Sequence, residues 1–180
     1  MVNIIFLDID GVLNCHSFYE SRDKNILDSN KFDHYKSDIC QMRIDLLNDL
    51  CKDINALVVI SSAWRIGKSL QELQDILNYC GATFKIIGKT DHLGYERGIE
   101  ISKWLKDNIS KLIPNCLYFD FYNYVIIDDD SDMLLNQSLH FFQTDGYSGL
   151  TPNICYKIKR FFKMLNPSNF QELSSGGLHV

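Results

Sequence analysis

The sequence predicts an α/β protein, a three-layer sandwich in which helices cover both faces of a mainly parallel sheet of five strands. Three observations lead to this prediction. Short, almost wholly apolar segments alternate with amphipathic ones along the chain. The apolar segments carry too few polar residues for strands with one face in water, which indicates a sheet buried on both sides. Polar residues directly follow three of these segments, as expected where ligands bind at the carboxyl ends of parallel strands.

The five expected strands are all short and apolar. In chain order they are residues 2–7 (VNIIFL), 56–61 (ALVVIS), 83–88 (TFKIIG), 124–127 (YVII) and 139–144 (LHFFQT). Each length suits a buried strand of a parallel sheet, whose connections pass over one of its faces.

Four segments between and after these strands have apolar residues at helical spacing. The apolar stripes are Ile39, Met42, Leu46, Leu47 and Leu50; Leu70, Leu73, Ile76 and Leu77; Ile101, Trp104, Leu105, Ile109 and Leu112; and Ile154, Ile158, Phe161 and Leu165. The first helix is expected over residues 39–53. Gly81 suits a left-handed cap after the second helix, and Pro114 ends the third. Thr151 and Pro152 suit the N-cap and first turn of the last.

Length and composition predict one globular domain. The chain has 180 residues, of which 46% are hydrophobic and 23% charged, enough for one core and too few for two comfortable domains. We expect the domain to cover residues 1–166, with a loose tail over residues 167–180. Residues 14–38 are polar and aromatic, and they are numerous enough for a flap or small lid but not for a folded cap domain.

Charge, hydropathy and cysteine content argue against several classes of protein. The net charge of −5 argues against broad adhesion to nucleic acid or anionic membranes, but it leaves recognition of a single phosphorylated end open. No apolar run reaches the roughly 20 residues of a membrane helix, and the N-terminus does not resemble a signal peptide. The six cysteines form no CxxC pair, so we expect buried free thiols in a cytoplasmic protein rather than a zinc site. The sequence sets no oligomeric state.

Carboxylates gather at the ends of two expected strands. Asp8 and Asp10, followed by Gly11, end the first strand, and the run from Asp128 to Asp130 follows the fourth. Such carboxylates repel one another at one sheet edge unless a cation lies between them, and oxygen ligands suit Mg²⁺. Taken alone, DxDG is also compatible with an acidic turn or a calcium loop, and IIDDD with a solvated loop. Their occurrence together, each behind an apolar strand, favours a metal site.

Four motifs resemble those of the haloacid dehalogenase-like (HAD) hydrolase superfamily. FLDIDGVLN is similar to its first motif, VVISSAWR to the second, ERGIEISKWL to the third and VIIDDDSDM to the fourth, over roughly residues 2–150. The fuller pattern of SSAWR, RGIEI, DDDSDM and GLT is similar to the HAD domain associated with RNA-repair proteins. The resemblance implies a Rossmann-like fold and a Mg²⁺-dependent phosphatase, a phosphomonoester hydrolase that acts through an aspartyl-phosphate.

The resemblance also implies chemical functions for individual residues. Asp8 would be the nucleophile, and Asp10 would act as general acid and then as general base. Ser61 would hydrogen-bond a phosphoryl oxygen, although a serine that caps a strand end or a helix is the alternative. Arg97 would offset charge in the transition state. Many family members carry lysine at that position, so Lys89 is an alternative to Arg97.

The expected metal ligands are Asp8, the backbone carbonyl of Asp10, and a carboxylate from the pair Asp128 and Asp129, with the choice within the pair left open. Asp132 would orient Arg97 or a metal-bound water, or else be simply exposed.

Four residues are expected to contact substrate. Gly11 would let the backbone turn beside the phosphate, and Ser62 would add a donor next to Ser61. Trp64 and Arg65 would stack on a base and bind a second phosphate at the rim of the site. The alternative for this pair is an indole in the core and an arginine on the surface.

A site with so small a lid admits large substrates. The expected partner is therefore a phosphorylated substrate: a nucleic-acid end, a phosphoprotein or a small phosphate ester, and no membrane. The alternative function is a catalytically silent HAD-fold module that binds a phosphorylated end or protein. Retention of both Asp8 and Asp10 argues against this alternative, because a binding module needs neither a nucleophile nor an acid–base group.

Overall fold

A computed structural model describes residues 2–22, 31–112 and 122–165 of the chain. Within these residues, five strands form one wholly parallel sheet in the order β3-β2-β1-β4-β5. The strands are β1 (Val2–Leu7), β2 (Ala56–Ile60), β3 (Ile86–Lys89), β4 (Tyr122–Asp128) and β5 (Phe141–Gln143). The expected α/β architecture is therefore confirmed, and β1, which carries the first acidic motif, lies at the centre of the sheet.

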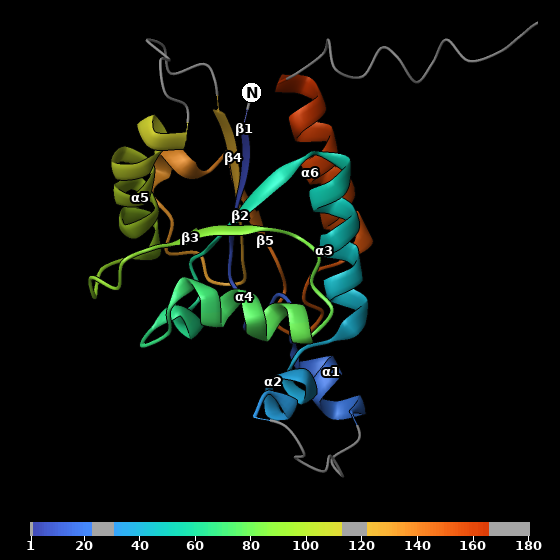
Figure 1. The fold of residues 1–180 in the computed structure, drawn as a ribbon. Coiled ribbons are helices and arrows are strands. Elements are labelled where there is room, and N and C mark those ends of the chain that lie inside the picture. Colours follow the sequence, from blue (N-terminus) through green and yellow to red (C-terminus); the bar gives the residue numbers. More distant parts are fainter. Residues whose placement is uncertain (1, 23–30, 113–121, 166–180) are drawn as a thin grey trace, which may run out of the picture.

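Helices cover both faces of this sheet (Figure 1). On one face lie α3 (Gln41–Asp53) and α6 (Pro152–Leu165), and α5 (Arg97–Leu112) lies on the other. Side chains of β1 alternate between the two cores, as a period of two requires: Ile5 and Leu7 belong to the core under α3 and α6. Ile4 and Phe6 belong to the core under α5. All four side chains are fully buried, which explains why the strand is apolar throughout.

The helices form where the apolar stripes predict them. α4 (Leu70–Tyr79) begins with a capping box in which the Ser69 side chain accepts the Glu72 N–H and the Glu72 carboxylate accepts the Ser69 N–H. Gly81 has a φ of +95°, as the expected left-handed position requires. Thr151 accepts the Ile154 N–H at 3.4 Å at the start of α6. Pro114 and the tail from residue 167 lie outside the described residues.

Strand boundaries differ from the expected ones, most clearly at β3, which begins at Ile86 rather than at residue 83. Side chains of two helices capture the backbone groups that a longer strand would use. Thr83 donates its N–H to Asn48 Oδ1, and Gln74 accepts the Ile86 N–H, each at 2.8 Å. Gln74 also donates to the carbonyl of Phe84. By contrast, β4 extends beyond the expected segment at both ends, and β5 is shorter at both ends.

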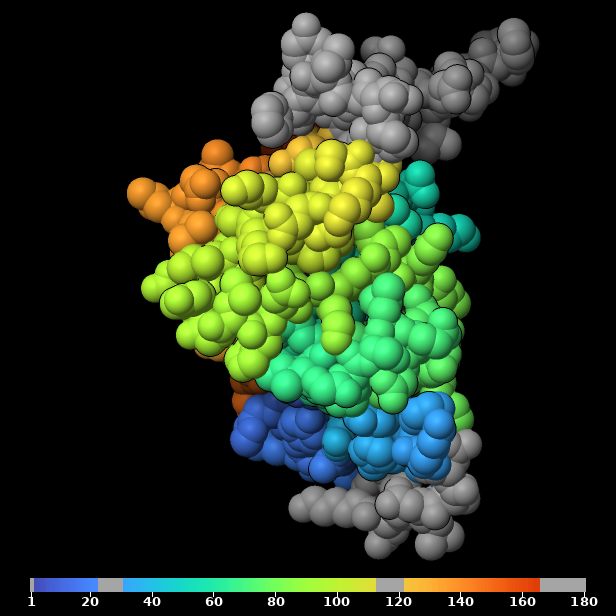
Figure 2. Space-filling model, turned by 60° about the vertical axis from the view of Figure 1, so that its left-hand side comes forward, coloured from blue at the N-terminus to red at the C-terminus, as the bar shows by residue number. Residues whose placement is uncertain are grey.

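The polar segment of residues 14–38 contributes two six-residue helices, α1 (His16–Ser21) and α2 (Asp33–Asp38). They lie beyond the carboxyl ends of the strands, opposite the start of β1 (Figure 1). Figure 2 shows them as a block beneath α4. The Tyr79 hydroxyl of α4 donates to Asp33 at 2.6 Å, and Arg22 pairs with Asp38 at 2.5 Å. These contacts hold the two helices next to the site described below.

The five cysteines among the described residues are buried and unbonded, as expected. Burial raises the pKa of the Cys51 thiol to about 12 and that of the Cys155 thiol to about 11, which makes both poor nucleophiles. In the part of the chain that the structure describes, no helix combines the length and the apolar character needed to span a membrane.

Candidate active site

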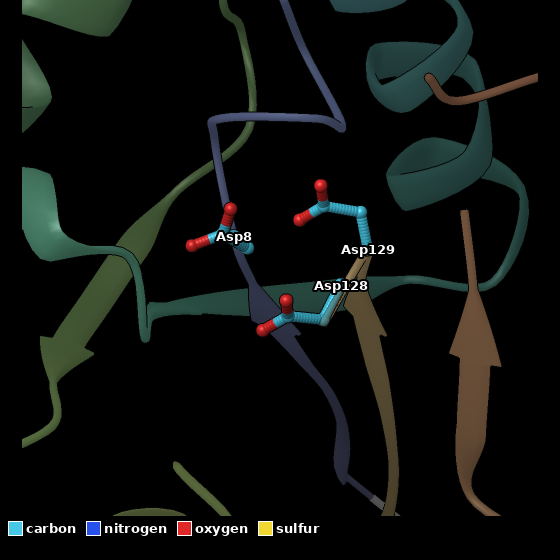
Figure 3. Close-up of side chains that lie close together, drawn as sticks. All are labelled: Asp8, Asp128 and Asp129. Carbon is cyan, nitrogen blue, oxygen red and sulfur yellow. The ribbon is translucent and has the colours of Figure 1, made fainter. Parts of the chain in front are cut away.

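Three carboxylates meet at the carboxyl edge of the sheet (Figure 3). Asp8 directly follows β1, Asp128 ends β4, and Asp129 comes next in the chain. Because β1 and β4 are parallel neighbours, with Leu7 opposite Ile127, their ends lie side by side. One oxygen from each carboxylate lies within 4.8 Å of the others. The structure thus brings together acidic residues that are about 120 positions apart in the sequence, as parallel pairing requires.

These carboxylates carry unusual pKa values. Asp8 is 4% exposed and Asp128 is fully buried. Burial, the largest cause, raises the pKa of Asp8 to about 6 and that of Asp128 to about 8. Repulsion from neighbouring carboxylates adds to both increases, and attraction to Arg97 opposes them. The pKa of the less buried Asp129 is also raised, again mainly by burial. Without a compensating cation, the cluster is thus costly to ionise.

Arg97 supplies part of that compensation. It is the first residue of α5, and its Nη1 donates to Asp8 Oδ1 and to the carbonyl of Ser61, the latter at 3.0 Å. The same nitrogen lies 3.2 Å from Asp128 Oδ2. Asp132 accepts the backbone N–H of Arg97 at 3.0 Å and so fixes the start of the helix. Asp132 therefore orients Arg97 through its backbone, one of the possibilities that the sequence left open.

Lys89, the alternative basic residue, has a different environment. Its Nζ donates to the carbonyls of Arg65, at 3.2 Å, and Lys68. The ammonium group thus ties the end of β3 to the loop before α4. Of the two candidates, Arg97 is the one that contacts the Asp8 carboxylate.

The donor set at this edge fits a divalent cation. Asp128 Oδ2 is buried and accepts no hydrogen bond from the described residues, although Arg97 lies nearby. Three ionised carboxylates and one guanidinium leave two negative charges uncompensated. Hard oxygen donors with this charge suit Mg²⁺. The side chain of Asp10 lies outside the group of three.

Asp10 has an exposed side chain that two donors hold. Asn14 donates to its Oδ1 at 2.7 Å, and the indole N–H of Trp64 lies 3.2 and 3.1 Å from its two oxygens. Asn14 is itself fixed, because its Oδ1 accepts the Gly11 N–H at 3.0 Å. The sequence interpretation missed Asn14. Its signal was a polar residue, with a side chain suited to turns, at the end of the apolar pair in DGVLN.

Gly11 makes room for a carboxylate. Its φ is +72°, and a Cβ at this position would lie 2.1 Å from Asp129 Oδ2. Both of its backbone groups bond within the protein, since its N–H goes to Asn14 and its carbonyl accepts the Thr144 hydroxyl at 2.9 Å. The tight turn expected at Gly11 is thus present, and the glycine also lets β1 and β4 bring their acidic ends together. Its position beside a bound phosphate stays a prediction. Thr144 was also missed.

The two serines after β2 differ in what their side chains do. Ser61 is fully buried, and its hydroxyl has no hydrogen-bond partner among the described residues. Ser62 is buried too, but its hydroxyl accepts the Trp64 N–H at 3.3 Å and caps the short 3₁₀ helix η1 (Ala63–Arg65). A hydroxyl that accepts one hydrogen bond can still donate another, so the expected contact of Ser62 with substrate stays a prediction. The Ser61 hydroxyl, one residue beyond β2, is a buried donor that a ligand oxygen would satisfy.

Arg65 is wrongly predicted, both as a rim residue and as a surface one. It is 5% exposed, and its guanidinium forms a buried ion pair with Glu100 of α5. It also donates to four backbone carbonyls, those of Ser61, Ser62, Thr90 and Asp91. Every side of the guanidinium is thus used inside the protein, and the residue fixes the turn after β2. Trp64 is half-buried, with its ring 5.3 Å from that of Tyr35.

One comparison with known proteins identifies a family. A family model described as "HAD domain in Swiss Army Knife RNA repair proteins" matches residues 4–154, which include every side chain of the site described above. No curated protein and no solved structure matches the chain significantly.

Proposed function

Because the chain belongs to the family of HAD domains in Swiss Army Knife RNA repair proteins, we propose that it is a Mg²⁺-dependent phosphatase that cleaves phosphomonoesters through an aspartyl-phosphate. One observation carries the proposal. Asp8, a buried carboxylate at the end of the central strand, contacts Arg97 and lies in a group of three carboxylates. This one sheet edge would thus supply a nucleophile, a cation to offset phosphoryl charge and a set of metal ligands.

In the first step, a carboxylate oxygen of Asp8 attacks phosphorus in line, and the bond from phosphorus to the ester oxygen breaks. Asp10 gives its carboxyl proton to that leaving oxygen. Arg97 is placed to offset negative charge on the nucleophile and on the transferred group. The unpartnered hydroxyl of Ser61 donates to a phosphoryl oxygen.

In the second step, a water oxygen attacks the same phosphorus, and the bond to Asp8 breaks. Asp10, now a carboxylate, takes the proton of that water, so phosphate leaves and both side chains regain their starting forms. Asp8, Asp128 and Asp129, with the carbonyl of Asp10, would hold the Mg²⁺. When bound, the ion supplies positive charge that lets the clustered carboxylates ionise and balances the charge of the phosphoryl group.

The surroundings of Asp10 support a nucleic-acid end as the substrate. Two aromatic rings of the short helices α1 and α2, those of Tyr19 and Tyr35, each have a cation beside them. Arg22 lies 4.5 Å from the Tyr19 ring centroid, and Lys68 lies 5.6 Å from that of Tyr35, whose ring packs on Trp64. Rings of this kind stack on bases, and cations beside them pair with backbone phosphates. A small sugar phosphate or a phosphopeptide would use this surface less fully.

The experiment that tests the proposal is phosphate release from a substrate panel with and without Mg²⁺. The panel holds oligonucleotides phosphorylated at the 3′ or the 5′ end, nucleotides, sugar phosphates and phosphopeptides. We expect Mg²⁺-dependent release, fastest from an oligonucleotide, and its loss in Asp8→Asn. Asp53→Asn makes the same change in a surface ion pair of α3 and should release phosphate normally. Tight binding of phosphorylated ends without release would instead establish the silent binding module.

A further inference from the structure

We infer that Trp64 is a positioning residue for Asp10: its indole N–H aims the Asp10 carboxyl group at the leaving oxygen of the substrate. The inference rests on the proposed function, because it assigns Trp64 a part in the proton transfer that Asp10 performs. It replaces the expected stacking of Trp64 on a base with a contact inside the protein.

Two donors from separate parts of the chain hold the Asp10 side chain. Asn14 is four residues away in the same turn, and Trp64 is 54 positions away on η1. The Trp64 Nε1 lies 3.2 and 3.1 Å from the two carboxylate oxygens, so one donor bridges both of them, whereas Asn14 contacts one oxygen only. A short, exposed aspartate without such donors would exchange among staggered rotamers. The two donors together hold the Asp10 side chain in one orientation.

Trp64 can impose a direction because it is itself held on three sides. Its backbone N–H donates to the Ser62 hydroxyl, which begins η1. The next residue, Arg65, locks that turn to α5 through the buried pair with Glu100. The indole packs against Tyr35 of α2, with 5.3 Å between ring centroids. The position of Asp10 therefore depends on the turn after β2 and on the packing of α2.

The inference has a kinetic signature that general damage to the fold would not produce. Proton donation matters most when the leaving oxygen is strongly basic, as in an alkyl ester, and least when it departs easily as an activated phenolate. A misdirected Asp10 should thus slow alkyl phosphates far more than activated aryl phosphates. Damage elsewhere in the site would slow all of them by a similar factor.

Trp64→Phe is the variant of choice, since it keeps an aromatic ring next to Tyr35 and removes the N–H donor together with part of the indole ring. We expect kcat/KM to fall by about tenfold or more for an alkyl phosphate and by about twofold or less for the most activated aryl phosphate, a small part of the roughly 10²–10⁴ that a full general acid supplies. Trp104→Phe is the matched control. Trp104 is the only other tryptophan of the chain, and it lies on α5 in the opposite core, 5.4 Å from the Phe6 ring. It should show no dependence on the leaving group.

Two further measurements separate this inference from a structural effect. In an Asp10→Asn background, Trp64→Phe should cause little additional loss, because a residue that acts through Asp10 has nothing left to position. In a Trp104→Phe background, Trp64 is the sole tryptophan, and Asp10→Asn should shift its fluorescence emission. The emission measurement needs no change at Trp64 and therefore holds even if Trp64→Phe fails to fold.

Uniform losses across the ester series, additive losses with Asp10→Asn, or an unchanged Trp64 emission would each overturn the inference. If the wild-type chain is active and the variants give such results, only the inference on Trp64 fails, and the proposed phosphatase function stands. A wild-type chain that hydrolyses none of the esters overturns the proposed function, and the inference with it.

Discussion

The guanidinium of Arg97 donates to Asp8 and lies 3.2 Å from Asp128, so one cation joins the ends of β1 and β4 to the first turn of α5. The two carboxylates end neighbouring strands in the middle of the sheet, where an unpaired anion is costly. Arg97 offsets part of their charge, and the remainder is what the proposed Mg²⁺ site accounts for. The same contacts place Arg97 beside the proposed nucleophile.

Replacing Arg97 should therefore reduce turnover. We expect Arg97→Ala to lower kcat by about 10²–10³, the range seen when one donor to developing charge is removed. Arg97→Lys should recover part of the loss, because it restores the charge but not the geometry of the guanidinium. Lys89→Ala is the control, since Lys89 donates to backbone carbonyls away from Asp8. A loss in Lys89→Ala with none in Arg97→Ala would reverse the assignment.

The raised pKa values of the acidic cluster predict how stability depends on pH in the metal-free protein. The pKa of Asp8 rises from 3.8 to about 6 and that of Asp128 from 3.8 to about 8 on folding. Between pH 3.8 and about 8, the folded state therefore binds more protons than the unfolded state. The contribution of these two groups to the free energy of unfolding is fully present below about pH 4, and it is lost as the pH rises towards 8. Thermal unfolding in a chelator should show this loss.

Two changes should reduce this loss of stability at high pH. Asp128→Asn removes the carboxyl group whose pKa is raised more, so the melting temperature of this variant should decline less between pH 4 and pH 8. Added Mg²⁺ should raise the melting temperature of the wild type most at pH 8, where the carboxylates are closest to full ionisation; each 1 kcal/mol corresponds to about 2–4 °C for a chain of this size. The same pH profile in wild type and Asp128→Asn would contradict the pKa assignment.

Gly11→Ala should abolish Mg²⁺ binding, because the added Cβ would occupy the position of the Asp129 carboxylate. Isothermal titration calorimetry with Mg²⁺ measures this directly. Gly67→Ala is a closely matched control: Gly67 has the same φ of +72° but no atom within 4 Å of the added Cβ. It should carry a similar backbone strain of roughly 1–2 kcal/mol and still bind the ion. Equal affinity in both variants would show that Gly11 does not make room for Asp129.

Arg65→Ala should destabilise the fold strongly. The substitution leaves Glu100 buried without its partner and releases four carbonyl acceptors, so we expect a loss of about 3–5 kcal/mol in the free energy of unfolding. Arg22→Ala removes the more exposed pair with Asp38 and should cost about 1 kcal/mol or less. Urea unfolding of both variants measures these two losses in the free energy of unfolding. Similar midpoints would show that the Arg65 network contributes little.

The sequence predicts the acidic group because its position follows from sheet topology. Apolar segments that end in carboxylates become parallel strands, and two such strands that pair must bring their ends together, as Asp8 and Asp128 do. The choice between Arg97 and Lys89 required the structure. It depends on where α5 begins, and Asp132 fixes that point through a contact 35 positions away.

The residues that were misassigned are those whose function depends on neighbours distant in the sequence. Arg65 looks like a rim residue until Glu100 and the carbonyl of Thr90 are placed around it. The space that Gly11 leaves for Asp129 likewise becomes visible only once β1 and β4 are paired. The start of β3 moves for the same reason, since side chains of α3 and α4 take its backbone donors. Local patterns carry no information on such contacts.

The most direct test of the central claim is the intact mass of Asp10→Asn after incubation with a phosphorylated substrate and Mg²⁺. This variant retains the nucleophile but lacks the base for the second step, so we predict slow turnover and a mass increase of one phosphoryl group. Peptide mapping should place that group on Asp8, and it should be absent in a variant that also carries Asp8→Asn. An unmodified Asp10→Asn protein that turns over at the wild-type rate would contradict the account.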